Sequence, residues 1–260
     1  MAEVYGIDVS RWQGDIDWDK LKANKELSFV ILRAASGCAF DTKFADYIAN
    51  CKRVGIPFGL YFASTALTVD AAVKEADFAI PVGKEHKSAY PCFFDMELDS
   101  QRALGKAAVT AMIKAWLERV SAAGLRAGNY TNKAWLDSYI NYAEIKQYDL
   151  WYAAYPSSGI KQLTDVPKDN QGKLSYPLAK LWQWTNSGRI DGISENVDMN
   201  VCYESYASAP PSPGPFLTAR EAILFLAEKG VLADPDYWLG RLEDALKLET
   251  LLIDMANALR

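Results

Sequence analysis

The sequence is poor in histidine, and its cysteines form no motif. His86 is the only histidine among 260 residues, and the cysteines, Cys38, Cys51, Cys92 and Cys202, include no Cys-x-x-Cys pair. Transition-metal sites need clusters of these residues, so we expect neither a metal nor a cofactor. The stretch GKEHKS around His86 is predicted to be a surface loop, which disfavours Ser-His and Cys-His nucleophilic catalysis.

Long apolar segments and an excess of positive charge are also missing. No run of 18 or more apolar residues is present, so we expect no transmembrane helix, and no signal sequence is visible before the first strand-like pattern. The net charge is −5 at pH 7, without a Lys/Arg run. Neither nucleic acid nor a membrane is therefore an expected partner. The expected origin is cytoplasmic synthesis, or secretion with a signal removed.

The first 206 residues alternate between strand-like and helix-like patterns. Strands are predicted over 4–10, 28–35, 57–64, 90–98, 126–131, 148–155, 178–184 and 195–201, and helices over 44–55, 69–80, 106–124 and 132–141. Such alternation is typical of parallel α/β folds, and eight strands suggest a (β/α)8-like, TIM-type barrel. Residues 156–177 show no amphipathic helix, so we expect the barrel to be irregular in its last part.

The composition changes after residue 206. Residues 207–216 form a Pro-rich linker, and residues 217–260 carry helix-like apolar stripes that predict a small all-α domain. About 45 residues make a marginal core, so we expect this domain to gain stability from a ligand, the barrel or self-association into a homo-oligomer.

The most informative stretch is YPCFFDMEL, an apolar strand that ends in two acids. Asp95 and Glu97 would share one face, with Cα atoms roughly 6.5 Å apart at a rise of about 3.3 Å per residue. Their charges would raise the pKa of one carboxyl and leave the other ionised. In a barrel, Asp8 and Asp198, each near a strand end, would join them at one rim. The alternative for Asp-x-Glu alone is a solvated strand end.

Aromatic residues are predicted at the same strand ends. They are Tyr61, Tyr130, Trp151, Tyr152, Tyr155, Trp182 and Trp184. Sugar rings stack on such side chains, although any single one is more often part of the core. Arg33 lies within a strand, where it would be costly without a partner. We expect a rim carboxylate as that partner, and the alternative is a side chain that reaches solvent.

Taken in order, several motifs resemble the family-25 glycoside hydrolases, which are lysozymes of fungi and phages. They are GIDVSRWQGDIDW, FVILRAASG, GLYFAS, FFDME, GNYT, LWYAAY, LWQWT and NVDMN, and they span residues 1–206. The resemblance implies cleavage of the β-1,4 bond between N-acetylmuramic acid and N-acetylglucosamine in bacterial peptidoglycan. It implies an acidic site of Asp8, Asp95, Glu97 and Asp198, with Arg33, Tyr61, Tyr130 and Trp184 lining it. One departure is Phe62-Ala63, where many members have His-Phe.

Glycoside hydrolysis assigns roles to these acids. Glu97 is predicted to be the general acid, and Asp95 to orient the substrate's N-acetyl group or the attacking water. Asp8 and Asp198 are predicted to position the substrate, with Asp198 as the alternative base. The barrel, linker and helical tail resemble a phage endolysin, which would be made in the host cytoplasm and released to the wall at lysis. Two alternatives are a chitinase-like N-acetylglucosaminidase and a non-catalytic wall-binding barrel.

Overall fold

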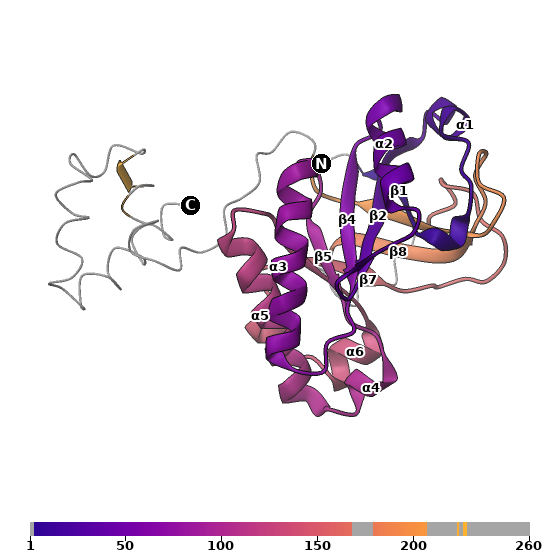
Figure 1. Ribbon diagram of the computed structural model, residues 1–260. Helices are drawn as coiled ribbons and strands as arrows, with labels where there is room; N and C mark the ends of the chain where they lie inside the picture. Colours follow the sequence, from indigo (N-terminus) through magenta and orange to yellow (C-terminus); the bar gives the residue numbers. More distant parts are fainter. Residues whose placement is uncertain (1–2, 168–178, 207–222, 224–225, 228–260) are drawn as a thin grey trace, which may run out of the picture. The chain divides into compact units, whose positions relative to one another are not determined.

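The computed structural model describes residues 3–167, 179–206, 223 and 226–227 (Figure 1). The chain divides into two compact units, Met1–Ser212 and Pro213–Arg260. In the second unit the structure describes only Ile223, Leu226 and Ala227, which are helical. The predicted linker, the rest of the predicted helical domain and its self-association therefore lie outside the described residues.

Eight strands close into a barrel, and a ninth extends one edge. In chain order the strands are β1 (Val4–Val9), β2 (Leu27–Ser36), β3 (Ala39–Phe40), β4 (Phe58–Ala63), β5 (Cys92–Asp95), β6 (Ala127–Asn132), β7 (Asp149–Ala153), β8 (Ala179–Gly188) and β9 (Val197–Cys202). Their order is β1-β9-β8-β7-β6-β5-β4-β2-β3, and a β1–β2 pairing closes the ring. The predicted α/β barrel is confirmed in this coarse form.

The last strand runs against the predicted direction. β9 pairs antiparallel with both β8 and β1, whereas the other barrel neighbours pair parallel. A parallel connection needs a crossover of a dozen or more residues, and only residues 189–196 join β8 to β9. The prediction of eight parallel strands was therefore wrong for β9, and the barrel is mixed.

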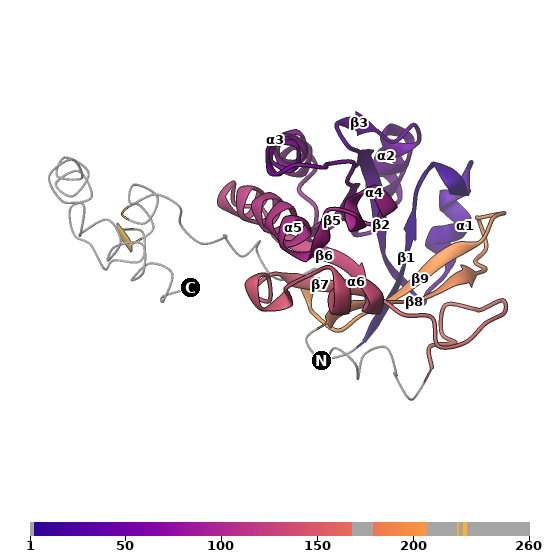
Figure 2. The same ribbon diagram turned by 90° about the horizontal axis from the view of Figure 1, so that it is seen from below.

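Helices pack on the outside of the barrel. They are α1 (Trp18–Ala23), α2 (Phe44–Val54), α3 (Val69–His86), α4 (Asp99–Arg102), α5 (Gly105–Ala122) and α6 (Lys133–Ser138), with short 3-10 turns η1 (Arg11–Gln13) and η2 (Tyr142–Glu144). Figures 1 and 2 show α3 and α5 side by side, and α5 packs against β5 and β6. Helices thus cover the outer face of these strands.

Helix α3 is longer than predicted. It passes through Pro81 and ends at His86, so His86 lies at a helix end and not in a loop. Proline in a helix interior costs about 3 kcal/mol, but Val82 and Gly83 beyond it are buried. Burial of this last turn offsets the cost of the proline. His86 packs its ring against Phe44 of α2.

Two layers of side chains fill the core. An outer layer lies between the strands and the helices, and an inner layer, which includes Phe29, Phe93 and Trp151, fills the barrel. Glycines make room for the inner rings. A Cβ atom on Gly6 would lie 2.4 Å from the Phe29 ring, and one on Gly128 would lie 2.5 Å from the Phe93 ring.

We predict that Gly128→Ala lowers the free energy of unfolding by about 1–3 kcal/mol, because the new Cβ would also lie 2.9 Å from the Asp149 backbone oxygen. Urea denaturation measures this. Gly188→Ala in β8 is the matched control, since the three atoms nearest to its Cβ all belong to the unbranched Met199 side chain and none to the backbone. An effect of Gly128→Ala no larger than that of the control would contradict the proposed packing.

Candidate active site

Four carboxyl groups lie at one end of the barrel. Asp8 is in β1, Asp95 is the last residue of β5, Glu97 follows two residues later, and Asp198 is the second residue of β9. Together with Tyr61, Tyr130, Trp151 and Gln183 they line a cavity of about 90 Å³. The structure thus brings together the four acids that the sequence singled out.

Two of the acids reach this end differently from the prediction. Asp198 lies near the start of its strand and not near the end. Because β9 is antiparallel, its start meets the C-terminal ends of the parallel strands, and Asp198 pairs in register with Asp8. Glu97 lies beyond β5, so it does not share a strand face with Asp95.

Asp8 and Asp198 form a hydrogen-bonded pair. Oδ2 of Asp8 accepts hydrogen bonds from the Gln183 and Asn200 side-chain amides, both at 2.8 Å. Burial raises the pKa of Asp8 to about 6, against the opposing effect of these hydrogen bonds. Burial, the charge of Asp8 and the hydrogen bond to it raise the pKa of Asp198 to about 9. At neutral pH the proton of the pair therefore lies on Asp198, which donates it to Asp8.

Asp95 and Glu97 form a second hydrogen-bonded pair. Burial raises the pKa of Asp95 well above its usual value, and the nearby charges of Glu97 and Asp8 act in the same direction. Burial also raises the pKa of Glu97, while the Arg102 charge and the hydrogen bond from Asp95 lower it. In the free protein the shared proton thus lies on Asp95. Its buried Oδ1 has no hydrogen-bond partner in the described part of the chain.

The segment after Glu97 is fixed by one buried side chain. Oε1 of Gln101 accepts a hydrogen bond from the Leu98 backbone N–H at 2.8 Å. Its Nε2 donates to the backbone oxygens of Ser64 and Ala66, at 3.1 and 3.2 Å. Gln101 is fully buried, so it holds the residue next to Glu97 against the loop that follows β4.

Two amides that the sequence analysis missed organise the cavity. Oε1 of Gln183 accepts hydrogen bonds from the Tyr130 and Tyr155 hydroxyls, at 2.8 and 2.5 Å. Oδ1 of Asn200 accepts one from the Trp151 indole N–H at 2.8 Å. Because each amide oxygen is occupied, each amide NH₂ faces Asp8. In the sequence, a polar residue inside an apolar strand, such as Gln183 in LWQW, is the feature that could have identified them.

The predicted aromatic contacts divide into three groups. Tyr61, Tyr130 and Trp151 line the acid cavity, and the Trp151 ring packs against both tyrosines. Tyr152 lines a neighbouring groove of about 760 Å³ that also includes Glu97, Tyr130 and Asp198. Trp184 belongs to neither, because it is fully buried in the outer core layer. Its predicted place in the site was wrong, since alternation along β8 turns Gln183 inward instead.

Arg33 has a different partner from the one predicted. Its Nε donates to Oδ2 of Asp41 at 2.6 Å, and the Asp41 side chain is almost fully buried. No rim acid forms this ion pair, although the Arg33 charge still acts to lower the pKa of Asp95. Asp41 lies in the loop after β3, and no pattern in the sequence marked it.

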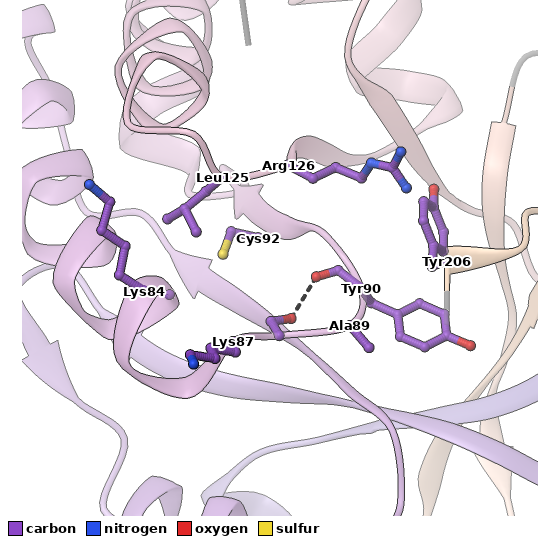
Figure 3. Close-up of a pocket in the computed structure, with 10 residues that line it drawn as sticks. Lys84, Lys87, Ala89, Tyr90, Cys92, Leu125, Arg126 and Tyr206 are labelled. Carbon is purple, nitrogen blue, oxygen red and sulfur yellow. Dashed lines mark hydrogen bonds between the residues drawn. The ribbon is translucent and has the colours of Figure 1, made fainter. Parts of the chain in front are cut away.

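A second cavity, of about 390 Å³, lies at the opposite end of the barrel (Figure 3). It is formed where β5 and β6 begin, and its lining includes Lys84, Tyr90, Cys92, Arg126 and Tyr206. No carboxyl group lines it, so it lacks the acid pairs described above.

The described ranges contain neither a metal-ligand cluster nor a helix that could span a membrane. Within residues 3–167 and 179–206, no group of His, Cys, Asp and Glu side chains is arranged to hold a metal ion. No helix in the same ranges is long and apolar enough to cross a membrane.

Comparisons with known proteins agree with this geometry. Residues 7–193 match the family model of glycosyl hydrolases family 25. Lysozyme M1 of Streptomyces globisporus is 27% identical over 209 residues, which cover 76% of this chain and 67% of the lysozyme.

Solved structures share the fold. The autolysin LytC of Streptococcus pneumoniae superposes with a TM-score of 0.65 at 24% identity, over 77% of this chain and 47% of LytC. This chain thus spans about half the length of LytC. The catalytic domain of endolysin ply40, from a bacteriophage of Listeria monocytogenes, gives a TM-score of 0.60 at 23% identity, over 79% of this chain and 96% of that domain. As the motifs predicted, the chain belongs to family 25 of the glycosyl hydrolases.

Proposed function

We propose that this protein is a muramidase that hydrolyses the β-1,4 bond between N-acetylmuramic acid and N-acetylglucosamine in bacterial peptidoglycan. The observation that carries the proposal is the pair Asp95 and Glu97, hydrogen-bonded to each other beside Asp8 and Asp198 at one cavity. Glycoside hydrolysis needs such a pair, one group to donate a proton and another to stabilise the developing positive charge. The family match and the lysozyme relative support the same activity.

Glu97 is the group placed to protonate the leaving oxygen. It lines both the acid cavity and the larger groove, whereas Asp95 lines the cavity alone. A glycan in the groove would therefore meet Glu97 first. Asp95 holds the shared proton in the free protein, and it passes that proton to Glu97 as the leaving oxygen approaches.

Asp95 then remains as a carboxylate next to the reacting sugar. Its unpartnered Oδ1 can accept a hydrogen bond from the substrate's N-acetyl N–H or from the attacking water. The negative charge also stabilises the oxocarbenium-like transition state. Asp8 stays ionised through its two amide donors and adds to the same negative field.

The substrate places the protein at the cell wall. The LytC structure was determined with a synthetic peptidoglycan ligand, and ply40 is named an endolysin. By analogy, we propose that this chain acts on the bacterial wall as an endolysin or a secreted lysozyme.

Glu97→Gln is predicted to lower kcat on purified peptidoglycan by about 10³-fold, because an amide cannot donate the catalytic proton. Gln has nearly the same size and shape as Glu, so the fold should persist, and circular dichroism checks this. Release of soluble reducing sugar measures the activity. Glu85→Gln, an exposed position at the end of α3, is the matched control and should behave as wild type. Retention of more than about a tenth of the activity by Glu97→Gln would rule out Glu97 as the acid.

The raised pKa of Asp198 predicts a pH-dependent stability. The folded chain holds a proton that the unfolded chain releases between its usual pKa of 3.8 and about 9, so the contribution of Asp198 to stability falls as pH rises through this range. The amide in Asp198→Asn keeps the hydrogen bond to Asp8 and does not titrate. Between pH 5 and pH 8 we therefore expect the free energy of unfolding of the wild type to fall by at least about 1 kcal/mol relative to that of Asp198→Asn.

Urea denaturation at the two pH values measures this difference. Asp191→Asn, at an exposed position in the β8–β9 connection, controls for a general loss of negative charge. A stability difference between Asp198→Asn and wild type that does not change with pH would show that Asp198 is already ionised in the folded protein at pH 5.

A further inference from the structure

An exposed tryptophan lies on a tightly held turn at the same end of the barrel as the acids, directly after β1. Trp12 is the middle residue of η1, which begins two residues after β1, and 67% of its surface is exposed. Trp12 does not line the acid cavity or the larger groove. A single exposed apolar side chain is common on protein surfaces, so the case for a binding role depends on where this ring lies and what surrounds it.

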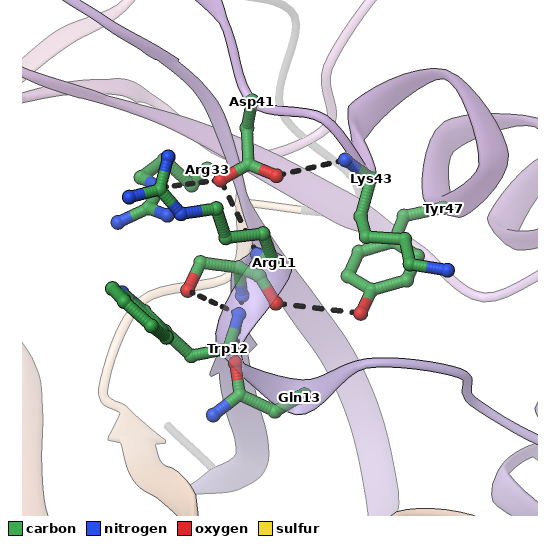
Figure 4. A network of polar contacts seen from close by, with 8 residues as sticks. Arg11, Trp12, Gln13, Arg33, Asp41, Lys43 and Tyr47 are labelled. Atoms are coloured by element: carbon green, nitrogen blue, oxygen red, sulfur yellow. Dashed lines mark hydrogen bonds and ion pairs between the residues drawn. The ribbon is translucent and has the colours of Figure 1, made fainter.

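Asp41 anchors this turn from one side (Figure 4). Its Oδ2 accepts hydrogen bonds from the Arg11 backbone N–H at 3.2 Å and from Arg33 Nε at 2.6 Å. Its Oδ1 accepts one from the Lys43 backbone N–H at 2.9 Å. A buried carboxylate is costly unless it is paired in this way, and here all of its partners fix η1, β2 and the loop after β3 to one another.

The remaining hydrogen bonds fix the turn from the other sides. Ser10 caps η1, since its Oγ accepts from the Trp12 N–H and its own N–H donates to Gln13 Oε1. The Tyr47 hydroxyl donates to the backbone oxygen of Gly14 at 2.5 Å, and the backbone oxygen of Ser10 lies 3.3 Å from the same hydroxyl. Every one of these contacts holds the backbone and leaves the indole of Trp12 free. The backbone that carries the ring is therefore fixed, which reduces the conformational entropy lost on binding.

The turn adjoins the acids on two sides. It follows Asp8 along the chain, and Gln13 Nε2 donates to the backbone oxygen of Asn196, two residues before Asp198. In the closed strand order, β1 lies across the barrel from β6, and the larger groove is lined from β6, β7 and β8. Trp12 and that groove thus lie on opposite sides of the acid cavity.

One face of the indole is already covered. The Arg11 guanidinium lies 4.9 Å from the ring centroid, in a cation–π contact. Figure 4 shows the Trp12 ring and the guanidinium groups of Arg11 and Arg33 on the side of the turn away from Tyr47. No other ring or cation contact to this indole is found in the described part of the chain, and most of the residue is exposed to solvent.

We propose that Trp12 is a sugar-stacking platform that extends the glycan-binding site beyond the acid cavity, on the side of β1. The apolar C–H face of a hexosamine ring would pack on the face of the indole that Arg11 does not cover. A glycan chain bound in the groove would cross the acids and reach Trp12. This inference rests on the proposed muramidase function.

The test uses the full chain with Glu97→Gln, so that the probe is bound but not cleaved. The probe is a purified glycan strand of alternating N-acetylglucosamine and N-acetylmuramic acid without stem peptides, and isothermal titration gives the Kd. Adding Trp12→Ala should weaken binding by about tenfold, and Trp12→Phe should weaken it less because a ring remains. Phe40→Ala is the matched control. Phe40 is 57% exposed but stacks on Phe44 and Phe78 of the outer helices, so its loss should leave the Kd unchanged.

Kinetics of the active chain give an independent readout. Trp12→Ala should raise KM about tenfold with kcat within about twofold of wild type, since the ring binds the glycan away from the reacting bond. An unchanged Kd and KM for Trp12→Ala, in a chain that binds and cleaves the glycan otherwise, would overturn the platform. If the wild-type chain neither binds nor cleaves the strand, the proposed function itself fails.

Discussion

The structure depends on keeping four carboxyl groups around one small cavity. Four ionised acids at such distances would repel one another strongly in a site of low dielectric. Two features prevent this. Each hydrogen-bonded pair keeps a proton, on Asp198 in one and on Asp95 in the other. The remaining charge on Asp8 is held by two amides, Gln183 and Asn200, whose own oxygens are fixed by aromatic side chains.

The barrel provides this arrangement through strand direction. Parallel strands bring Asp8 and Asp95 to the same end, and the reversed β9 brings Asp198 there from its start. A parallel β9 would have carried its first residues to the opposite end. The short β8–β9 connection is therefore as important for the site as the acids themselves. The apolar inner layer below the cavity supplies the burial that raises the pKa values.

Much of this was predictable from the sequence, because strand ends and acids coincide in the motifs. The barrel, the family and the grouping of the acids follow from local patterns. The error over the partner of Arg33 arose because partners across loops depend on the path of the backbone. Arg33 pairs with Asp41 because β3 turns the chain back along β2, and nothing near Arg33 indicates that turn. Trp184 was misplaced because the alternation around Gln183 was not applied to β8.

The proposed muramidase activity is tested most directly by the chemical identity of the new chain ends. Purified Gram-positive peptidoglycan would be digested, reduced with borohydride and examined by mass spectrometry. A muramidase would leave reduced muramic acid at the new ends, since the bond broken is the one after N-acetylmuramic acid. Reduced glucosamine at those ends would mean an N-acetylglucosaminidase. The absence of new ends from several wall types would mean a barrel that binds glycan without cleaving it.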